Sequence, residues 1–174
     1  MDQFCQNYLL EERDIVKRFP VHGSDIVKWD KGHVAIYARG GAAVLTAHAA
    51  LLAGAGLVTI LCPQNEWSNL FALRPEVMVK TPENLDYRRH DALVVGPNCG
   101  FSVESQNFIL HCWQKYPNPM VVDADAIRII AENKPKESSY CRVLTPHISE
   151  ASHILNIEKG LIKERPYNAV EQLQ

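Results

Sequence analysis

The sequence predicts an α/β fold in which a mostly parallel sheet carries helices on both faces. Short apolar runs rich in β-branched residues recur from residue 31 onwards, and such runs are typical of strands buried on both faces. Segments of helical length separate these runs. Strands and helices that alternate in this way form βαβ units around a parallel sheet. With 174 residues and 47% hydrophobic content, the chain can bury one sizeable core.

The elements follow one another in a regular order. Gly54 and Gly56 give stop signals after the first helix, Ser102 and Asp125 are the expected N-caps of later helices, and Ser149 is a weaker one. At least five strands are expected from the apolar runs at His33–Ala38, Leu57–Cys62, Val77–Val79, Ala92–Val95, Met120–Val122 and Arg142–Leu144. Five helices are expected at Ala42–Ala53, Asn65–Leu73, Ser102–Tyr116, Ala126–Asn133 and Glu150–Leu155.

The first part of the chain differs from the rest. Residues 1–30 are polar and irregular, so they are interpreted as a lead-in or linker tail with a short helix over Asn7–Arg18. The regular pattern begins at Lys31. The predicted domain therefore covers residues 31–174.

Composition excludes several classes of function. The formal net charge is −2, and the densest basic cluster, residues 87–90, is too small for a nucleic-acid interface. The five cysteines form no CxxC pair, which indicates reduced intracellular thiols, and the histidines show no metal-ligand spacing. We find no signal peptide and no run of membrane-spanning length. A cytoplasmic protein without a metal site, nucleic-acid partner or membrane partner is expected.

Three short motifs follow predicted strands directly. They are Gly96-Pro97-Asn98-Cys99-Gly100, Asp123-Ala124-Asp125-Ala126 and Thr145-Pro146-His147-Ile148-Ser149-Glu150. The carboxyl ends of parallel strands meet at one edge of a sheet, where open α/β sheets bind their ligands. The three motifs are therefore expected to build one crevice.

Each candidate residue has a functional and a structural interpretation. The Gly40-Gly41-Ala42 step lets a ligand approach the backbone, or is only a tight turn. The Gly96–Gly100 loop, stiffened by its proline, contacts a ligand or is a well-formed βα turn. Asp123 bonds a ligand hydroxyl or positions a cation, whereas Asp125 is favoured as a helix cap. His147 donates to a ligand phosphate or carbonyl, or is a structural donor.

Together these residues resemble one family, from about residue 28 to the end of the chain. Lys31-Gly32-His33-Val34, the stretch from Gly41 to Thr59, and Arg74-Pro75-Glu76-Val77-Met78 are similar to segments of the NAD(P)H-hydrate dehydratases of the ribokinase-like superfamily. The three crevice motifs resemble that family's Gly-Pro-Gly-Leu-Gly loop, Asp-Ala-Asp-Ala-Leu turn and Thr-Pro-His-Pro-Gly-Glu turn.

The resemblance implies nicotinamide cofactor repair. In this family, hydrated NADH or NADPH is dehydrated at the expense of ADP or ATP with Mg²⁺, through a phosphorylated intermediate. By motif, Ala42, Gly100 and His147 match positions that contact the hydrated cofactor, and Asn98 and Asp123 lie in the same motifs. These five residues form the expected substrate-binding set.

The sequence also departs from the family pattern. The glycine loop is about four residues shorter around 38–41, Asn98-Cys99 replaces Gly-Leu, and Ile148-Ser149 replaces Pro-Gly. The family's nucleotide-binding segment and its Gly-Thr-Gly-Asp motif, which supplies the catalytic base, are expected beyond Gln174. Residues 31–174 would then be the N-terminal part of the domain, incomplete at the C-terminus, with no catalytic residue of their own and no activity alone.

Three interpretations remain open. The chain is an enzyme of this family whose C-terminal part is missing or separately encoded, a non-catalytic remnant or binding module, or a ribokinase-like kinase for a small alcohol. The segments at 75–77 and 144–147 favour the dehydratase over the kinase. Relatives suggest a homo-oligomer.

Overall fold

A computed structural model describes residues 13, 16, 25–71 and 75–173 of the chain. These residues divide into two compact units, Val27–Pro146 and a unit that contains the residues from His147 onwards. Apart from residues 13 and 16, the helix expected over residues 7–18 lies outside the described residues, as does most of the expected lead-in. Within the described ranges, no helix is long and apolar enough to cross a membrane.

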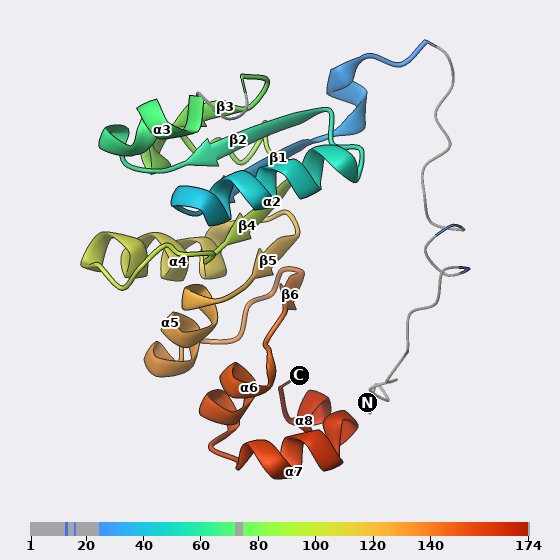
Figure 1. Cartoon of the computed structure of the whole chain (residues 1–174), viewed down its shortest axis with the longest axis vertical. Helices are drawn as coiled ribbons and strands as arrows, with labels where there is room; N and C mark the ends of the chain where they lie inside the picture. Colours follow the sequence, from blue (N-terminus) through green and yellow to red (C-terminus); the bar gives the residue numbers. More distant parts are fainter. Residues whose placement is uncertain (1–12, 14–15, 17–24, 72–74, 174) are drawn as a thin grey trace. The chain divides into compact units, whose positions relative to one another are not determined.

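The larger unit is built on a six-stranded sheet in which every neighbouring pair is parallel (Figure 1). Its order is β3-β2-β1-β4-β5-β6. The sheet confirms the predicted fold class, and each expected strand is present within one residue. The strands are β1 (His33–Tyr37), β2 (Leu57–Leu61), β3 (Met78–Lys80), β4 (Ala92–Val95), β5 (Met120–Val122) and β6 (Arg142–Leu144).

Helices cover both faces of the sheet, as β1 shows. Successive side chains of a strand point to opposite faces, and Ile36 packs in a buried cluster with residues of α2 (Gly40–Leu52) and α3 (Trp67–Phe71). Tyr37 points to the other face, where its hydroxyl donates to Ser105 Oγ of α4 (Val103–Lys115) at 3.0 Å. Helix α5 (Asp125–Asn133) packs beside α4.

Short 3-10 helices precede β1 and occur in two connections of the larger unit. They are η1 (Lys28–Lys31), η2 (Gln64–Glu66) and η3 (Pro82–Asn84). The turn between α2 and β2 packs directly against η1. A Cβ at Gly56 would lie 1.7 Å from the carbonyl oxygen of Lys28, and Gly54 has a φ of +103°. The glycines of this turn are therefore structural, as the sequence predicted.

The helix caps correct two predictions. Ser102 caps α4 as expected, because its hydroxyl accepts from the N–H of Ser105 at 3.2 Å. Asp125 is not a cap but the first residue of α5, and its carboxylate bonds a distant loop instead. Ser149 is not a cap either. His147 caps α6 (Ile148–Leu155), since its Nδ1 accepts from the N–H groups of residues 149 and 150.

The smaller unit contains α6, α7 (Lys159–Glu164) and α8 (Pro166–Leu173). Ala151, Ile162 and Ala169 form its buried core. No helix was predicted for the segments of α7 and α8, because both helices are short and Gly160 and Pro166 interrupt the stretch.

Candidate functional site

The strand order places a topological switch point between β1 and β4. The chain leaves β1 toward β2 and β3 on one side, whereas β4, β5 and β6 lie on the other side. Ligands of open parallel sheets bind where the strand order reverses, outside the carboxyl ends of the strands. The loops that follow β1 and β4 therefore define the candidate site.

The loops after β1 and β4 are bonded to each other through the main chain. The N–H of Arg39 donates to the carbonyl oxygen of Pro97 at 3.2 Å, and the N–H of Gly96 donates to that of Tyr37 at 3.1 Å. The side chain of Asn98 is exposed and lies beside Gly40, because a Cβ at Gly40 would be 3.6 Å from Asn98 Nδ2. The expected residue Ala42 sits in the first turn of α2, next to this junction.

The β4 loop needs its glycines for two different reasons. Gly96 has a φ of +119°, and a Cβ there would lie 1.8 Å from the carbonyl oxygen of Asp123, so the loop has no room for a side chain. Gly100 has a φ of +74°, but a Cβ there would meet nothing within 4 Å. The backbone at Gly100 thus faces open space. Asn98, between them, also adopts a positive φ of 54°.

Two carboxylates connect the β5 loop to its neighbours. Asp125 Oδ2 accepts from the N–H of Gly100 at 2.9 Å, and Asp123 Oδ1 accepts from Thr145 Oγ1 at 2.9 Å. Ala124 between them has a φ of 47° and a ψ of −122°, a rare conformation for a residue with a side chain. Strain of this kind is concentrated at functional sites.

These bonds bring together the ends of β1, β4, β5 and β6, so the predicted placement of the motifs at one edge of the sheet is confirmed up to Thr145. His147 belongs to the smaller unit, and its contribution to the crevice stays a prediction. Its side chain is 66% exposed, and its Nε2 lies 3.2 Å from Glu150 Oε1. The structure thus shows its capping role directly.

Arg39 is a further residue of the candidate site, outside the set expected from the sequence. It precedes α2 at the switch point, and its Nε lies 3.6 Å from Glu66 Oε1. This Nε is buried and, among the described residues, has no hydrogen-bond partner. Burial raises the pKa of the nearby Cys99 thiol to about 12, so this neutral thiol adds no charge and Glu66 is the anionic partner of Arg39. In the sequence, the position of Arg39 in the shortened loop could have indicated its place at the site.

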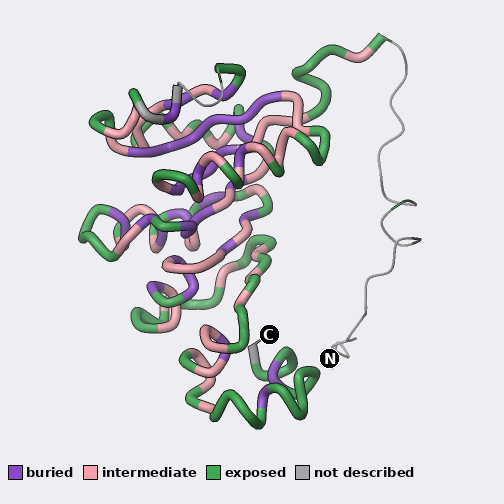
Figure 2. Tube along the Cα trace, in the orientation of Figure 1, coloured by how far each residue is buried: buried purple, intermediate pink, exposed green. Residues whose placement is uncertain are grey.

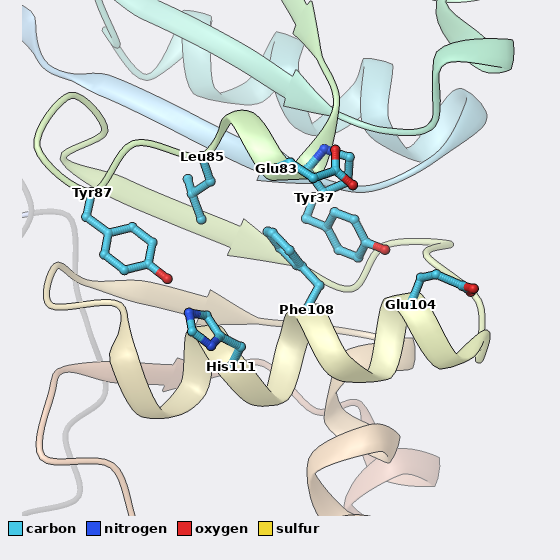
Figure 3. Close-up of a pocket in the computed structure, with 8 residues that line it drawn as sticks. Tyr37, Glu83, Leu85, Tyr87, Glu104, Phe108 and His111 are labelled. Carbon is cyan, nitrogen blue, oxygen red and sulfur yellow. The ribbon is translucent and has the colours of Figure 1, made fainter.

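A groove of about 360 Å³ adjoins the switch point on the face of Tyr37 (Figure 3). It runs between α4 and the segment 82–87. The rings of Tyr37 and Phe108 lie 4.2 Å apart in it, and Tyr87 and His111 line its other end. Glu83 and Glu104 add two carboxylates. Because the β3–β4 connection must cross the sheet to form this groove, no local sequence pattern reveals it.

Within the described part of the chain, no group of three or more His, Cys, Asp or Glu side chains is arranged to hold a metal ion. The four described cysteines, at positions 62, 99, 112 and 141, are free thiols. Burial raises the pKa of Cys62 to about 11 and that of Cys112 to about 12. These thiols are protonated at neutral pH and unreactive as nucleophiles.

Comparisons with known proteins agree with this architecture. A family model described as NAD(P)H-hydrate dehydratase matches residues 36–173. The bifunctional NAD(P)H-hydrate repair enzyme Nnr of Escherichia coli is 33% identical over 156 residues, which cover 84% of this chain and 29% of that protein. The Coxiella burnetii enzyme of the same name is 29% identical over 180 residues, covering 98% and 36%. The ADP-dependent (S)-NAD(P)H-hydrate dehydratase of Staphylococcus aureus is 30% identical over 168 residues, covering 88% and 60%.

Solved structures share the fold. The ADP/ATP-dependent NAD(P)H-hydrate dehydratase of Bacillus subtilis, co-crystallised with ATP/Mg²⁺, superposes with a TM-score of 0.77 at 19% identity, over 91% of this chain and 59% of that one. A ribokinase-like superfamily protein of Enterococcus faecalis gives a TM-score of 0.74 at 23% identity, over 89% and 61%. The chain therefore spans about three fifths of these structures and 29% to 36% of the bifunctional relatives described above.

Proposed function

Because the chain belongs to the NAD(P)H-hydrate dehydratase family, we propose that its 174 residues hold the hydrated nicotinamide dinucleotide of a cofactor-repair enzyme. The reaction is the dehydration of hydrated NADH or NADPH at the expense of ADP or ATP. The observation that supports this most is the switch point, where the loops after β1, β4 and β5 are bonded into one surface with open backbone at Gly41 and Gly100.

The residues of this surface suit different parts of a dinucleotide. Arg39 supplies positive charge for the pyrophosphate, whose anionic oxygens guanidinium groups bind well. Asn98 offers an exposed amide for a carboxamide or ribose group. Asp123 uses Oδ1 for Thr145, so its second oxygen accepts from a ligand hydroxyl. The aromatic groove beside them accepts a flat ring.

The nucleotide and its Mg²⁺ fit these residues poorly. Asp125 already accepts from Gly100, Asp123 accepts from Thr145, and no further acidic group completes a cation site among the described residues. Mg²⁺ requires several oxygen ligands in nearly octahedral geometry. We therefore assign the dinucleotide to this segment and no step of phosphoryl transfer to it.

Calorimetry with hydrated NADH tests the proposal. Gly100→Val should weaken binding because the side chain would fill the open space that the ligand needs. Asp123→Asn should weaken it by removing a charged acceptor, on the order of tenfold. Lys115→Gln is the control, because Lys115 is exposed in the last turn of α4, at the end of this helix opposite to the β4 loop. Absence of binding to the unaltered chain would overturn the proposal.

A test of His147 requires a substitution that still caps the N-terminus of α6. Asn is a good N-cap residue, so His147→Asn preserves the start of α6 and removes only the imidazole. Weaker binding by this variant, with unchanged helix content by circular dichroism, supports a ligand contact at His147. Unchanged binding would leave His147 with the capping role alone.

Turnover provides a second test. Residues 1–174 alone should show no ADP- or ATP-dependent recovery of NADH absorbance from its hydrate. Loss of a catalytic base commonly costs on the order of 10² to 10⁴ in rate, and loss of the nucleotide site removes the reaction. Robust turnover by this segment would contradict the assignment and would make Asp123 the first candidate for the base.

A further inference from the structure

A second cavity, of about 690 Å³, lies away from the switch point. It is lined by the first residues of β1, β2 and β3, namely His33, Leu57 and Met78, and by the connection at 84–91. The crevice lies at the opposite ends of these strands. Because β1 has five residues, the two ends are about 13 Å apart at about 3.3 Å per residue.

An imidazole with an unused lone pair lines this cavity. His90 is 2% exposed, and its Nδ1 lies 2.8 Å from the carbonyl oxygen of Asp86. The N–H of Asp86 also lies 3.3 Å from Nδ1, but the shorter contact is to a carbonyl oxygen, which only accepts. We therefore assign the proton of the neutral ring to Nδ1, and Nε2 keeps the lone pair. Among the described residues Nε2 has no hydrogen-bond partner, although it is buried. A buried polar atom without a partner is unfavourable unless a ligand or water completes it.

The charges of the cavity leave cations without partners. Asp91 Oδ2 accepts from the N–H of His33 at 2.8 Å, and Asp86 pairs with Arg89 at 3.5 Å. Lys80 and Arg88 also line the cavity, and neither side chain has an ion-pair partner in the described part of the chain. Trp29, which is 66% exposed, lies at the same cavity.

We propose that this cavity is a second ligand site, which takes a small molecule carrying a phosphate group, either inorganic phosphate or a nucleoside monophosphate. Lys80 and Arg88 neutralise the phosphate. His90 takes up a proton from the solvent and donates it from Nε2 to a phosphate oxygen. With a nucleotide, the base stacks on Trp29. The dehydratase activity does not require this site.

The surroundings of the two histidines explain why they are neutral without a ligand. Burial, the neighbouring ring of His90 and the charge of Lys80 lower the pKa of His33 to about 4. Burial and Lys80 also lower the pKa of His90, against the opposing effects of Asp86 and Asp91. The two rings lie 4.3 Å apart. A bound phosphate neutralises Lys80 and favours the protonated ring.

Calorimetry with inorganic phosphate, in two buffers of different ionisation enthalpy, tests the site. We expect binding near neutral pH that takes up protons from the buffer. Lys80→Gln should weaken binding on the order of tenfold by removing a paired charge. Absence of phosphate binding would overturn the proposal. Phosphate binding that takes up no protons and has the same affinity in Lys80→Gln would also overturn it.

The nitrogen signal of His90 gives a test that needs no substitution. In ¹⁵N spectra, addition of phosphate should move Nε2 from the unprotonated to the protonated range, and an unmoved signal contradicts the proposal. AMP distinguishes the two ligand sources. Tighter binding of AMP than of phosphate, lost in Trp29→Ala, indicates a nucleotide, whereas equal binding indicates free phosphate.

Two variants separate this site from the crevice. Arg39→Gln removes the cation at the switch point and should leave phosphate binding unchanged. A loss of phosphate binding in this variant would place the anion in the crevice and overturn the proposal. Lys80→Gln should leave the binding of hydrated NADH unchanged. The two variants therefore test the second site and the proposed function independently of each other.

Discussion

In the centre of the sheet, Ala35, Ile36 and Tyr37 of β1 are at most 3% exposed, whereas Val143 of β6 at the edge is 47% exposed (Figure 2). Central strands are thus held by packing on both faces. The edge strand depends on Arg142, whose guanidinium donates to three carbonyl oxygens near the C-terminus of α4. The loops of the candidate site differ in the same way in what supports them. Those after β1 and β4 rest on a packed core, and the one after β6 rests on a polar anchor.

Gly96 offers the strongest test of the packed centre. Gly96→Ala should destabilise the protein by about 3 kcal/mol or more, because the methyl group would overlap the carbonyl of Asp123. Gly100→Ala is the matched control, with only the strain of a positive φ, about 1 to 2 kcal/mol. Urea unfolding measures both. Equal costs would show that backbone strain alone, and not close packing, fixes the β4 loop.

Arg142→Gln tests the polar anchor at the edge. The variant should lose about 2 to 3 kcal/mol, because charge-assisted bonds to the α4 carbonyls disappear. Hydrogen exchange should increase in β6 and at the end of α4 but not in β1. Arg89→Gln, which removes the exposed ion pair with Asp86, should cost about 0.5 kcal/mol or less. Faster exchange throughout the sheet would contradict a local anchor.

Acid should weaken the centre of the sheet through His33, the first residue of β1. The pKa of His33 is lowered to about 4 by burial and by its charged neighbours, so the unfolded chain binds more protons between about pH 6.5 and 4. Stability should therefore be full above about pH 6.5 and fall as the pH drops through this window. Urea midpoints at several pH values measure the slope. In His33→Gln the slope should become shallower, and an unchanged slope would exclude His33 as its cause.

Thr145→Val should give the smallest effect. It removes the bond to Asp123 Oδ1 at the border between the central and edge loops, at a cost of about 1 kcal/mol. Urea unfolding of Thr145→Val beside the unaltered chain measures this cost. A free energy of unfolding that does not change would show that this bond does not contribute to stability.

The sequence predicted what depends on local pattern. Each strand buries its own apolar side chains, so the strands could be placed within one residue, and Ser102 caps a helix with its own hydroxyl. Asp125 was assigned wrongly because its partner Gly100 lies 25 residues away and is reached only through the fold. The role of Arg39 and the cavity at His90 likewise depend on which loops the sheet brings together.

Mapping of amide shifts with hydrated NADH, in a ¹⁵N-labelled chain of 19.6 kDa, tests the central claim most directly. The central claim is that the switch point between β1 and β4 holds the dinucleotide. The largest shifts should occur at Gly40, Gly41, Asn98 and Gly100, with His33 and Leu57 unaffected. Shifts confined to the residues at the other ends of the strands, or no shifts at the four loop residues, would contradict it.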